Sequence, residues 1–162
     1  MGVREMPKGL VVYDSKTGNT EKMAMAISQG MEKGGLGVKV KRVEDASLSD
    51  LTDADAIVLG SPTYFANMSG NMKKFVDKSV ELYPDKLKDR VGAVFTSYEG
   101  QGDYTALSSL IIAMLFHQMI IVGHQSGGIG ATSVGAPDDK CIAECQVFGE
   151  RIADFAKAIA KK

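Results

Sequence analysis

The sequence predicts an α/β protein in which a parallel sheet is covered by helices on both faces. Apolar runs of strand length alternate along the chain with longer stretches of helical periodicity. The strand-length runs are almost continuously apolar, which is typical of strands buried on both faces. Loops rich in Ser, Thr, Asn and Gly follow three of these runs. Together these features predict one sheet with helices on both sides.

The first half of the chain supplies three strands and one long helix. Gly9–Tyr13 is the first strand because of its Leu-Val-Val core, and Thr20–Gly34 is a helix that ends in glycines. Val38–Val43 and Ala56–Ser61 are the second and third strands. The apolar positions of the helix that recur at helical spacing are Met23, Ala26, Ile27 and Met31.

The second half continues the alternation. Met68–Glu81 is predicted as a helix, and Arg90–Ser97 as the fourth strand. Asp103–Gln118 is a strongly apolar helix that we expect to be buried on several sides. Ile120–Gly123 is the fifth strand, and Pro137–Lys161 closes the chain as an amphipathic helix.

Composition and charge narrow the class of protein. A length of 162 residues predicts a single domain over residues 1–162. A net charge of −1 without a charged block argues against nucleic acid and anionic membranes as partners. No apolar run approaches the length of a membrane span, so we expect no membrane insertion. Two cysteines do not make a disulfide scaffold, and a reducing cytoplasm is the expected compartment.

The segment from Ser15 to Thr20 has the composition of a phosphate-binding loop. It leads from the first strand into the first helix, and helix N-termini attract anions. Ser15 and Thr17 can donate hydroxyl hydrogen bonds to phosphate oxygens. Gly18 permits a close approach or a positive φ, and Thr20 or Asn19 can cap the helix. The alternative is a well-capped turn without a ligand.

Two common nucleotide motifs are absent from the chain. A P-loop would need Gly-x-x-x-x-Gly-Lys-[Ser/Thr], and a dinucleotide site would need Gly-x-Gly-x-x-Gly after the first strand. Neither pattern occurs there. Gly128-Ile129-Gly130 comes late, has no third glycine in register, and is interpreted as a loop.

Two motifs in the correct order resemble known flavoproteins. Thr17-Gly18-Asn19-Thr20 resembles the loop with which flavodoxins hold the 5′-phosphate of FMN. Gly60–Gly70 and the following run Val91–Ser97 resemble the WrbA family of NAD(P)H:quinone oxidoreductases. The resemblance spans nearly the whole chain. It implies a flavodoxin-like three-layer sandwich with a five-stranded parallel sheet in the order 2-1-3-4-5, and FMN as the noncovalent cofactor.

The resemblance also implies which residues contact the cofactor. Three loops are expected to meet at the carboxyl ends of the strands. By the family pattern, the second loop lies against the flavin and Tyr98 of the third loop covers the ring. The predicted cofactor-binding residues are Ser15, Lys16, Thr17, Gly18, Asn19, Thr20, Pro62, Thr63, Tyr64, Phe65, Asn67, Ser97, Tyr98, Glu99, Gly100 and Gly102. No residue is expected to be a nucleophile or a metal ligand.

Two redox functions compete at this stage, and a binding module without redox activity is a third alternative. An electron carrier would exchange electrons with redox partner proteins, whereas a WrbA-like enzyme would use NAD(P)H and a quinone. WrbA proteins usually carry an aromatic residue in the phosphate loop, where this chain has Thr17, and a paired His where it has Phe116. These departures and the short length favour the carrier. The near-neutral charge and the Pro62–Gly70 loop favour the enzyme, and a homo-oligomer is possible.

Three further residues have predicted structural roles. His117 lies near the end of an apolar helix, and we expect a half-buried, hydrogen-bonded imidazole whose protonated form the helix C-terminus favours. Cys141 and Cys145 lie four residues apart on the last helix. We expect core packing rather than a redox pair or a zinc site.

Overall fold

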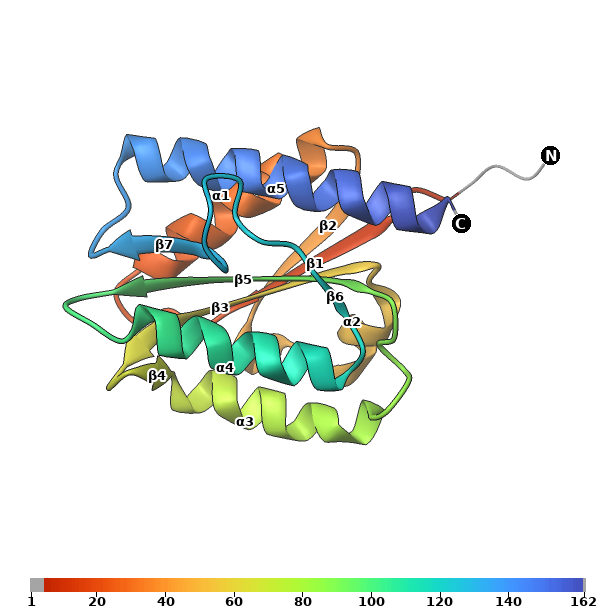
Figure 1. Cartoon of the computed structure of the whole chain (residues 1–162), viewed down its shortest axis with the longest axis horizontal. Helices are drawn as coiled ribbons and strands as arrows, with labels where there is room; N and C mark the ends of the chain where they lie inside the picture. The colour runs from red at the N-terminus through yellow and green to blue at the C-terminus, as the bar shows by residue number, and fades with distance from the viewer. Residues whose placement is uncertain (1–4, 162) are drawn as a thin grey trace.

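The computed structural model describes residues 5–161 and consists of a twisted sheet between two layers of helices (Figure 1). The elements of the first half are β1 (Lys8–Tyr13), α1 (Asn19–Lys33), β2 (Gly37–Arg42), η1 (Val43–Asp45), α2 (Leu48–Asp53), β3 (Ala56–Tyr64) and β4 (Asn67–Met68). Those of the second half are α3 (Gly70–Lys78), η2 (Ser79–Leu82), β5 (Val91–Tyr98), α4 (Asp103–Phe116), β6 (Ile120–Ile121), β7 (Ala131–Val134) and α5 (Asp139–Ala160).

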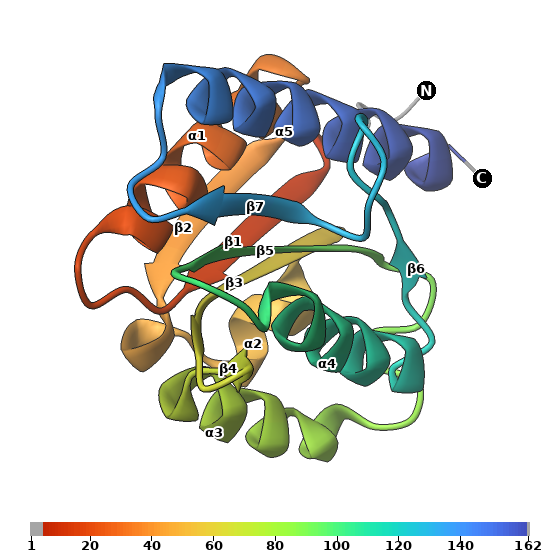
Figure 2. The same cartoon turned by 60° about the vertical axis from the view of Figure 1, so that its left-hand side comes forward.

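The main sheet is parallel and has the order β2-β1-β3-β5-β6. These are the second, first, third, fourth and fifth predicted strands, so the expected order 2-1-3-4-5 is confirmed. Helices α1 and α5 cover one face, while α2, α3 and α4 lie on the other (Figures 1 and 2). The predicted α/β fold with three layers is therefore confirmed.

The core consists of two apolar clusters, one on each face of the sheet. In β1, Val11 points toward α1 and α5, whereas Leu10 and Val12 point toward α2, α3 and α4. Successive side chains of a strand point to opposite faces, so a strand buried on both sides must be apolar throughout. Phe95 and Val94 divide β5 between the clusters in the same way.

The fifth strand differs from the prediction. β6 pairs only with the first two residues of β5, Val91 and Gly92. The chain then leaves the sheet edge and returns as β7, which pairs with β5 from Phe95 to Tyr98. The interpretation of Gly128-Ile129-Gly130 as a loop holds, but it leads into a strand that the sequence analysis missed. β7 alternates buried and exposed residues, as an edge strand does, and has no continuous apolar run.

Two element boundaries also differ. The predicted helix over Met68–Glu81 begins only at Gly70, because Met68 belongs to the short antiparallel strand β4. The Ser69 hydroxyl accepts a hydrogen bond from the amide of Met72 at 3.2 Å and so caps the helix. The helix continues as a 3₁₀ turn in η2. None of the helices formed by residues 5–161 is long and apolar enough to cross a membrane.

Candidate functional site

Three loops meet at the carboxyl ends of β1, β3 and β5 and line a cleft of about 330 Å³. The neighbouring parallel strands all point their carboxyl ends toward this edge, which is where open α/β sheets bind ligands. Ten of the predicted site residues line the cleft: Lys16, Thr17, Asn19, Thr20, Pro62, Thr63, Tyr64, Ser97, Tyr98 and Glu99. Gly135, which follows β7, completes the lining and was not predicted.

The first loop is organised by the hydroxyl of Ser15. Its Oγ accepts the amide of Gly18 at 3.1 Å and the amide of Glu21 at 3.3 Å. Ser15 therefore satisfies the start of α1, and the expectation that Thr20 or Asn19 caps this helix is wrong. The residue at the N-cap position is Gly18, whose φ of 91° is the left-handed conformation that glycine adopts at low cost.

The same arrangement leaves backbone donors available at the helix N-terminus. The amides of Asn19 and Thr20 have no acceptor among residues 5–161, because the first turn of an α-helix offers no intrahelical partner. The amide of Lys22 bonds to the carbonyl of Gly18 at 3.1 Å and continues the helix. Two free N–H groups at the positive end of a 15-residue helix form an anion-binding arrangement.

The one acidic side chain in the first turn of α1 is engaged elsewhere. The Glu21 carboxylate lies 3.4 Å from Nη1 of Arg42 on β2. Nη2 of the same guanidinium donates to the carbonyl of Ser15 at 2.6 Å, and its Cζ lies 5.5 Å from the centre of the Tyr13 ring. Arg42 thus offsets the negative charge of Glu21 and fixes the first loop from behind.

Hydroxyl pairs join the loops to one another. Thr20 Oγ1 and Ser97 Oγ are 2.7 Å apart and buried, so they connect the first loop with the third. Thr63 Oγ1 lies 2.8 Å from Thr96 Oγ1, which in turn donates to the carbonyl of Ser61 at 2.6 Å. These bonds, two of which are buried, hold three separate segments in one arrangement.

Two aromatic residues, Tyr64 and Tyr98, belong to the lining of the cleft. Burial raises the pKa of Tyr64, and the nearby negative charge of Asp14 raises it further. Asp14 is itself buried and follows β1 directly, where its amide donates to the carbonyl of Gly60 at 3.0 Å. Tyr64 therefore remains neutral at physiological pH.

Six predicted residues lie outside the lining of the cleft: Ser15, Gly18, Phe65, Asn67, Gly100 and Gly102. Ser15 and Gly18 shape the first loop from behind. The Phe65 side chain is fully exposed, since Phe65 and Ala66 form the tip of the hairpin between β3 and β4 with positive φ values of 46° and 65°. The Asn67 Oδ1 accepts from the Ser109 hydroxyl at 2.9 Å. A Cβ added at Gly102 would overlap Ala66.

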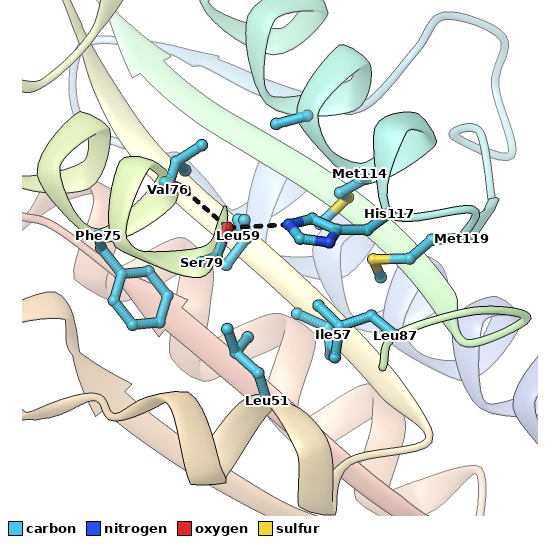
Figure 3. A pocket seen from close by; sticks show the side chains of 11 residues that line it. Leu51, Ile57, Leu59, Phe75, Val76, Ser79, Leu87, Met114, His117 and Met119 are labelled. Carbon is cyan, nitrogen blue, oxygen red and sulfur yellow. Dashed lines mark hydrogen bonds between the residues drawn. The ribbon is translucent and has the colours of Figure 1, made fainter. Parts of the chain in front are cut away.

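His117 lies in a second cavity, away from the cleft, and Figure 3 shows its ring among apolar side chains. The Ser79 hydroxyl donates to the carbonyl of Val76 at 2.6 Å, so Nε2–H of His117 donates to Ser79 Oγ at 2.9 Å. Nδ1 is buried without a partner among the described residues. The cavity of about 20 Å³ is comparable with a single water molecule, which excludes it as a cofactor site.

The electrostatics of His117 correct one expectation. Burial lowers the pKa of the imidazole, so the neutral ring is favoured rather than the protonated one. His117 is nine-tenths buried and follows the last residue of α4, whereas the cleft lies at the opposite end of this 14-residue helix. His117 therefore does not serve the cleft.

The two cysteines pack as expected. Cys145 belongs to the apolar cluster between the sheet and the helices α1 and α5, and Cys141 packs against it. Both thiols are free. A hydrogen bond from the Cys145 thiol lowers the pKa of Cys141 to about 7, and the same hydrogen bond together with burial raises the pKa of Cys145.

Comparison with known proteins places the chain among flavodoxins and related reductases. A family model for the flavodoxin domain matches residues 10–105. An NAD(P)H dehydrogenase (quinone) of Archaeoglobus fulgidus is 35% identical over 95% of this chain and its own full length. A flavodoxin of Clostridium saccharobutylicum is 33% identical over 92% of this chain and 97% of its own.

Solved structures give the same result. A flavodoxin from the domain Archaea superposes with a TM-score of 0.81 and 33% identity, covering 93% of this chain and 99% of that one. A flavodoxin, WrbA-like protein from Agrobacterium tumefaciens superposes with a TM-score of 0.83 and 28% identity, covering 94% of this chain and 98% of that one. The matches extend over both halves of the sheet and all three loops of the cleft, and the chain belongs to the flavodoxin domain family.

Proposed function

We propose that this chain binds FMN noncovalently in the cleft and carries electrons between redox partner proteins in the cytoplasm. The observation that carries the proposal is the anion-binding start of α1, where the amides of Asn19 and Thr20 lack acceptors among the described residues. This arrangement lies in the same cleft as the rings of Tyr64 and Tyr98. The helix start would bind the phosphate group of FMN, and the two tyrosine rings would bind its flat aromatic ring.

The residues of the first loop suit a phosphate. The amides of Asn19 and Thr20 would donate to its oxygens, and the hydroxyl of Thr17, which lines the cleft, would donate a third bond. Lys16 is exposed at the rim and adds a positive charge. Glu21 does not oppose the phosphate strongly, because Arg42 pairs with it.

The remaining lining residues suit the ring. FMN, when bound, supplies reversible electron transfer. Tyr64 and Tyr98 would pack against its ring, and each aromatic contact contributes about 1 kcal/mol. The carboxylate of Glu99 lines the same cleft and makes additional negative charge there less favourable. The sixteen residues predicted above remain our proposal for the cofactor site, with Gly135 added.

One residue of the cleft favours a carrier. The cleft, with a volume of about 330 Å³, is at the lower end of the range of small-molecule sites, roughly 300–1,000 Å³. Thr17, at the cleft, offers no aromatic ring on which a nicotinamide could stack.

A second candidate is a quinone reductase that uses NAD(P)H. The similarity to the Archaeoglobus fulgidus NAD(P)H dehydrogenase (quinone) supports it, because that relative matches along its full length. In this case the exposed ring of Phe65 would lie beside the cofactor on the substrate side.

One set of measurements tests both candidates. Purified protein is titrated with FMN, and quenching of flavin fluorescence gives the Kd. The loaded protein is then mixed with NADH or NADPH and a quinone. Absence of FMN binding would contradict both candidates. Oxidation of NAD(P)H at about 10 per second, a typical enzymatic turnover, would contradict the carrier and support the reductase.

A further inference from the structure

Arg42 lies beside the first loop of the cleft, although it belongs to a different part of the chain. It is the last residue of β2, which is the strand next to β1 in the sheet (Figure 2). The parallel pairing sets Arg42 opposite Tyr13, the last residue of β1, and the first loop begins immediately after Tyr13. Arg42 does not line the cleft. It can therefore influence a ligand there only through its charge or through the first loop.

The guanidinium of Arg42 is the donor to the carbonyl of Ser15. Nη2 donates to this oxygen at 2.6 Å, and no backbone amide in the described part of the chain donates to it. A planar guanidinium has five N–H donors, so it can make this bond and interact with other groups at the same time. Nη1 lies 3.4 Å from Glu21, Nε lies 3.7 Å from Glu44, and the group covers the ring of Tyr13. Contacts on several sides thus fix the guanidinium against the Ser15 carbonyl.

The Ser15 carbonyl can compete for one of the free amides of α1. In a helical turn, the amide of a residue bonds to the carbonyl four residues earlier, and Ser15 stands four residues before Asn19. A Ser15 carbonyl without a donor would be stabilised by turning toward the Asn19 amide, because an unpaired buried polar group is costly. Ser15 is itself buried, so water does not readily replace the guanidinium. With Arg42 in place, the Asn19 amide has no acceptor among the residues that the structure describes.

We propose that Arg42 is a positioning residue for the phosphate of FMN, because its bond to the Ser15 carbonyl keeps the amide of Asn19 free to donate to a phosphate oxygen. This inference rests on the FMN site proposed above and adds the residue that selects the phosphate. Riboflavin has the same ring as FMN but no phosphate, so its binding does not use the Asn19 amide. Arg42 should therefore contribute to the affinity for FMN and not to the affinity for riboflavin.

A simpler role for Arg42 would be the neutralisation of charge. Glu21 lies in the first turn of α1, and its carboxylate would repel a phosphate more strongly without Arg42 beside it. The side chains of Arg42 and Glu21 are 39% and 41% exposed, so solvent weakens this repulsion. The two roles differ in their consequences. Removal of the Glu21 carboxylate corrects the charge but leaves the Ser15 carbonyl without its donor.

The experiment measures the Kd of FMN and the Kd of riboflavin by quenching of flavin fluorescence. The ratio of the two constants is the phosphate selectivity. Arg42→Met keeps most of the apolar stem and removes the guanidinium. We expect the selectivity to fall about tenfold, the effect of losing one hydrogen bond to the phosphate, while the Kd of riboflavin stays within about twofold. Arg42→Lys keeps the positive charge but has no planar fork to hold Ser15 and Glu21 together, so it should also lose selectivity.

The matched control is Arg151→Met on α5. Arg151 also donates to a backbone carbonyl, that of Gly123 at 3.1 Å, and its guanidinium lies over the ring of Phe155. It does not line the cleft. The substitution therefore removes the same kind of contacts elsewhere, and the phosphate selectivity should not change.

A second substitution separates position from charge. Adding Glu21→Gln to Arg42→Met removes the carboxylate, and we expect it to restore only a small part of the selectivity. Full restoration would overturn the proposal, because charge alone would then explain the loss. An unchanged selectivity in a folded Arg42→Met variant, or equal weakening of FMN and riboflavin, would overturn it as well. These outcomes leave the FMN site itself intact, whereas failure of the unaltered protein to bind FMN would contradict the proposed function and with it this inference. Circular dichroism reports that each variant is folded.

Discussion

The substitution Thr17→Asp tests the position of the phosphate at the start of α1. Thr17 lies in the lining of the cleft and precedes Gly18, two residues before the free amide of Asn19. A carboxylate at this place would stand next to the FMN phosphate if the cofactor binds as proposed. We expect weaker FMN binding with an unchanged fold.

The exposure of Thr17 sets the size of the effect. Two unit charges 4 Å apart interact with about 1 kcal/mol in water and about 4 kcal/mol at the effective dielectric of a protein surface. Thr17 is exposed and the cleft is open, so the lower part of this range applies. For a phosphate with a charge of about −1.5 to −2, we expect about 2 kcal/mol. This corresponds to a Kd about 30-fold higher.

Flavin fluorescence titration at two salt concentrations measures the change. Salt screens exposed charges over about 10 Å at 0.1 M and about 3 Å at 1 M. The difference between Thr17→Asp and the unaltered protein should therefore shrink at high salt. Thr17→Asn changes the shape without a charge, and Ser126→Asp adds a charge on a loop outside the cleft. Both controls should bind FMN within a few-fold of the unaltered protein.

The reasoning also predicts the stability of the variant. An acidic residue near a helix N-terminus interacts favourably with the helix dipole, by about 0.3–1 kcal/mol. Thr17→Asp should therefore be at least as resistant to urea as the unaltered protein. An unchanged Kd for FMN in a folded Thr17→Asp variant would refute the placement of the phosphate.

Three further predictions concern stability, each measured by urea unfolding. Burial lowers the pKa of His117 in the folded state, so the unfolded state binds more protons and the free energy of unfolding falls as the pH drops below about 6.5. The substitution His117→Gln should flatten this pH dependence between pH 5 and 7. An unchanged slope in the variant would contradict the prediction. Gly60→Ala should lower the free energy of unfolding by about 1–3 kcal/mol or more, because the new Cβ would overlap the buried ring of Phe95. An unchanged stability would mean that the ring moves freely. Thr20→Val leaves the Ser97 hydroxyl buried without its partner and should cost about 1–3 kcal/mol. Adding Ser97→Ala should cost less than the two single changes together, and strict additivity would show that the bond contributes nothing.

Some features of the fold followed from local sequence patterns. The runs in β1, β3 and β5 are apolar throughout because both faces of each strand are covered, and this requirement is visible in the residues themselves. The start of α1 was placed correctly to within one residue, because glycine and hydroxyl residues follow a strand directly. The sequence analysis assigned the wrong cap to α1. The hydroxyl of Ser15, four residues before the first residue of the helix, accepts the amides at the helix start.

Other features depended on distant parts of the chain. β7 has four residues with alternating burial, and what makes it a strand is the free edge of β5 beyond the end of β6. Its position brings Gly135 into the cleft, which no motif indicated. Phe65 illustrates the same limit, because the tight hairpin between β3 and β4 decides that its ring points into solvent.

The resemblance to flavodoxins implied the order of the strands. The sequence by itself determined the class of fold and the positions of the main strands, and it predicted the loop at which a phosphate would bind. These depend on periodicity and on residue types within short segments, which act locally. Only the tertiary structure decided how Thr20 pairs with Ser97, how the interrupted edge strand completes the cleft, and which side of helix α4 remains uncovered. Each of these is a contact, or a missing contact, between segments far apart in the chain, and its free energy exists only once both segments are in place.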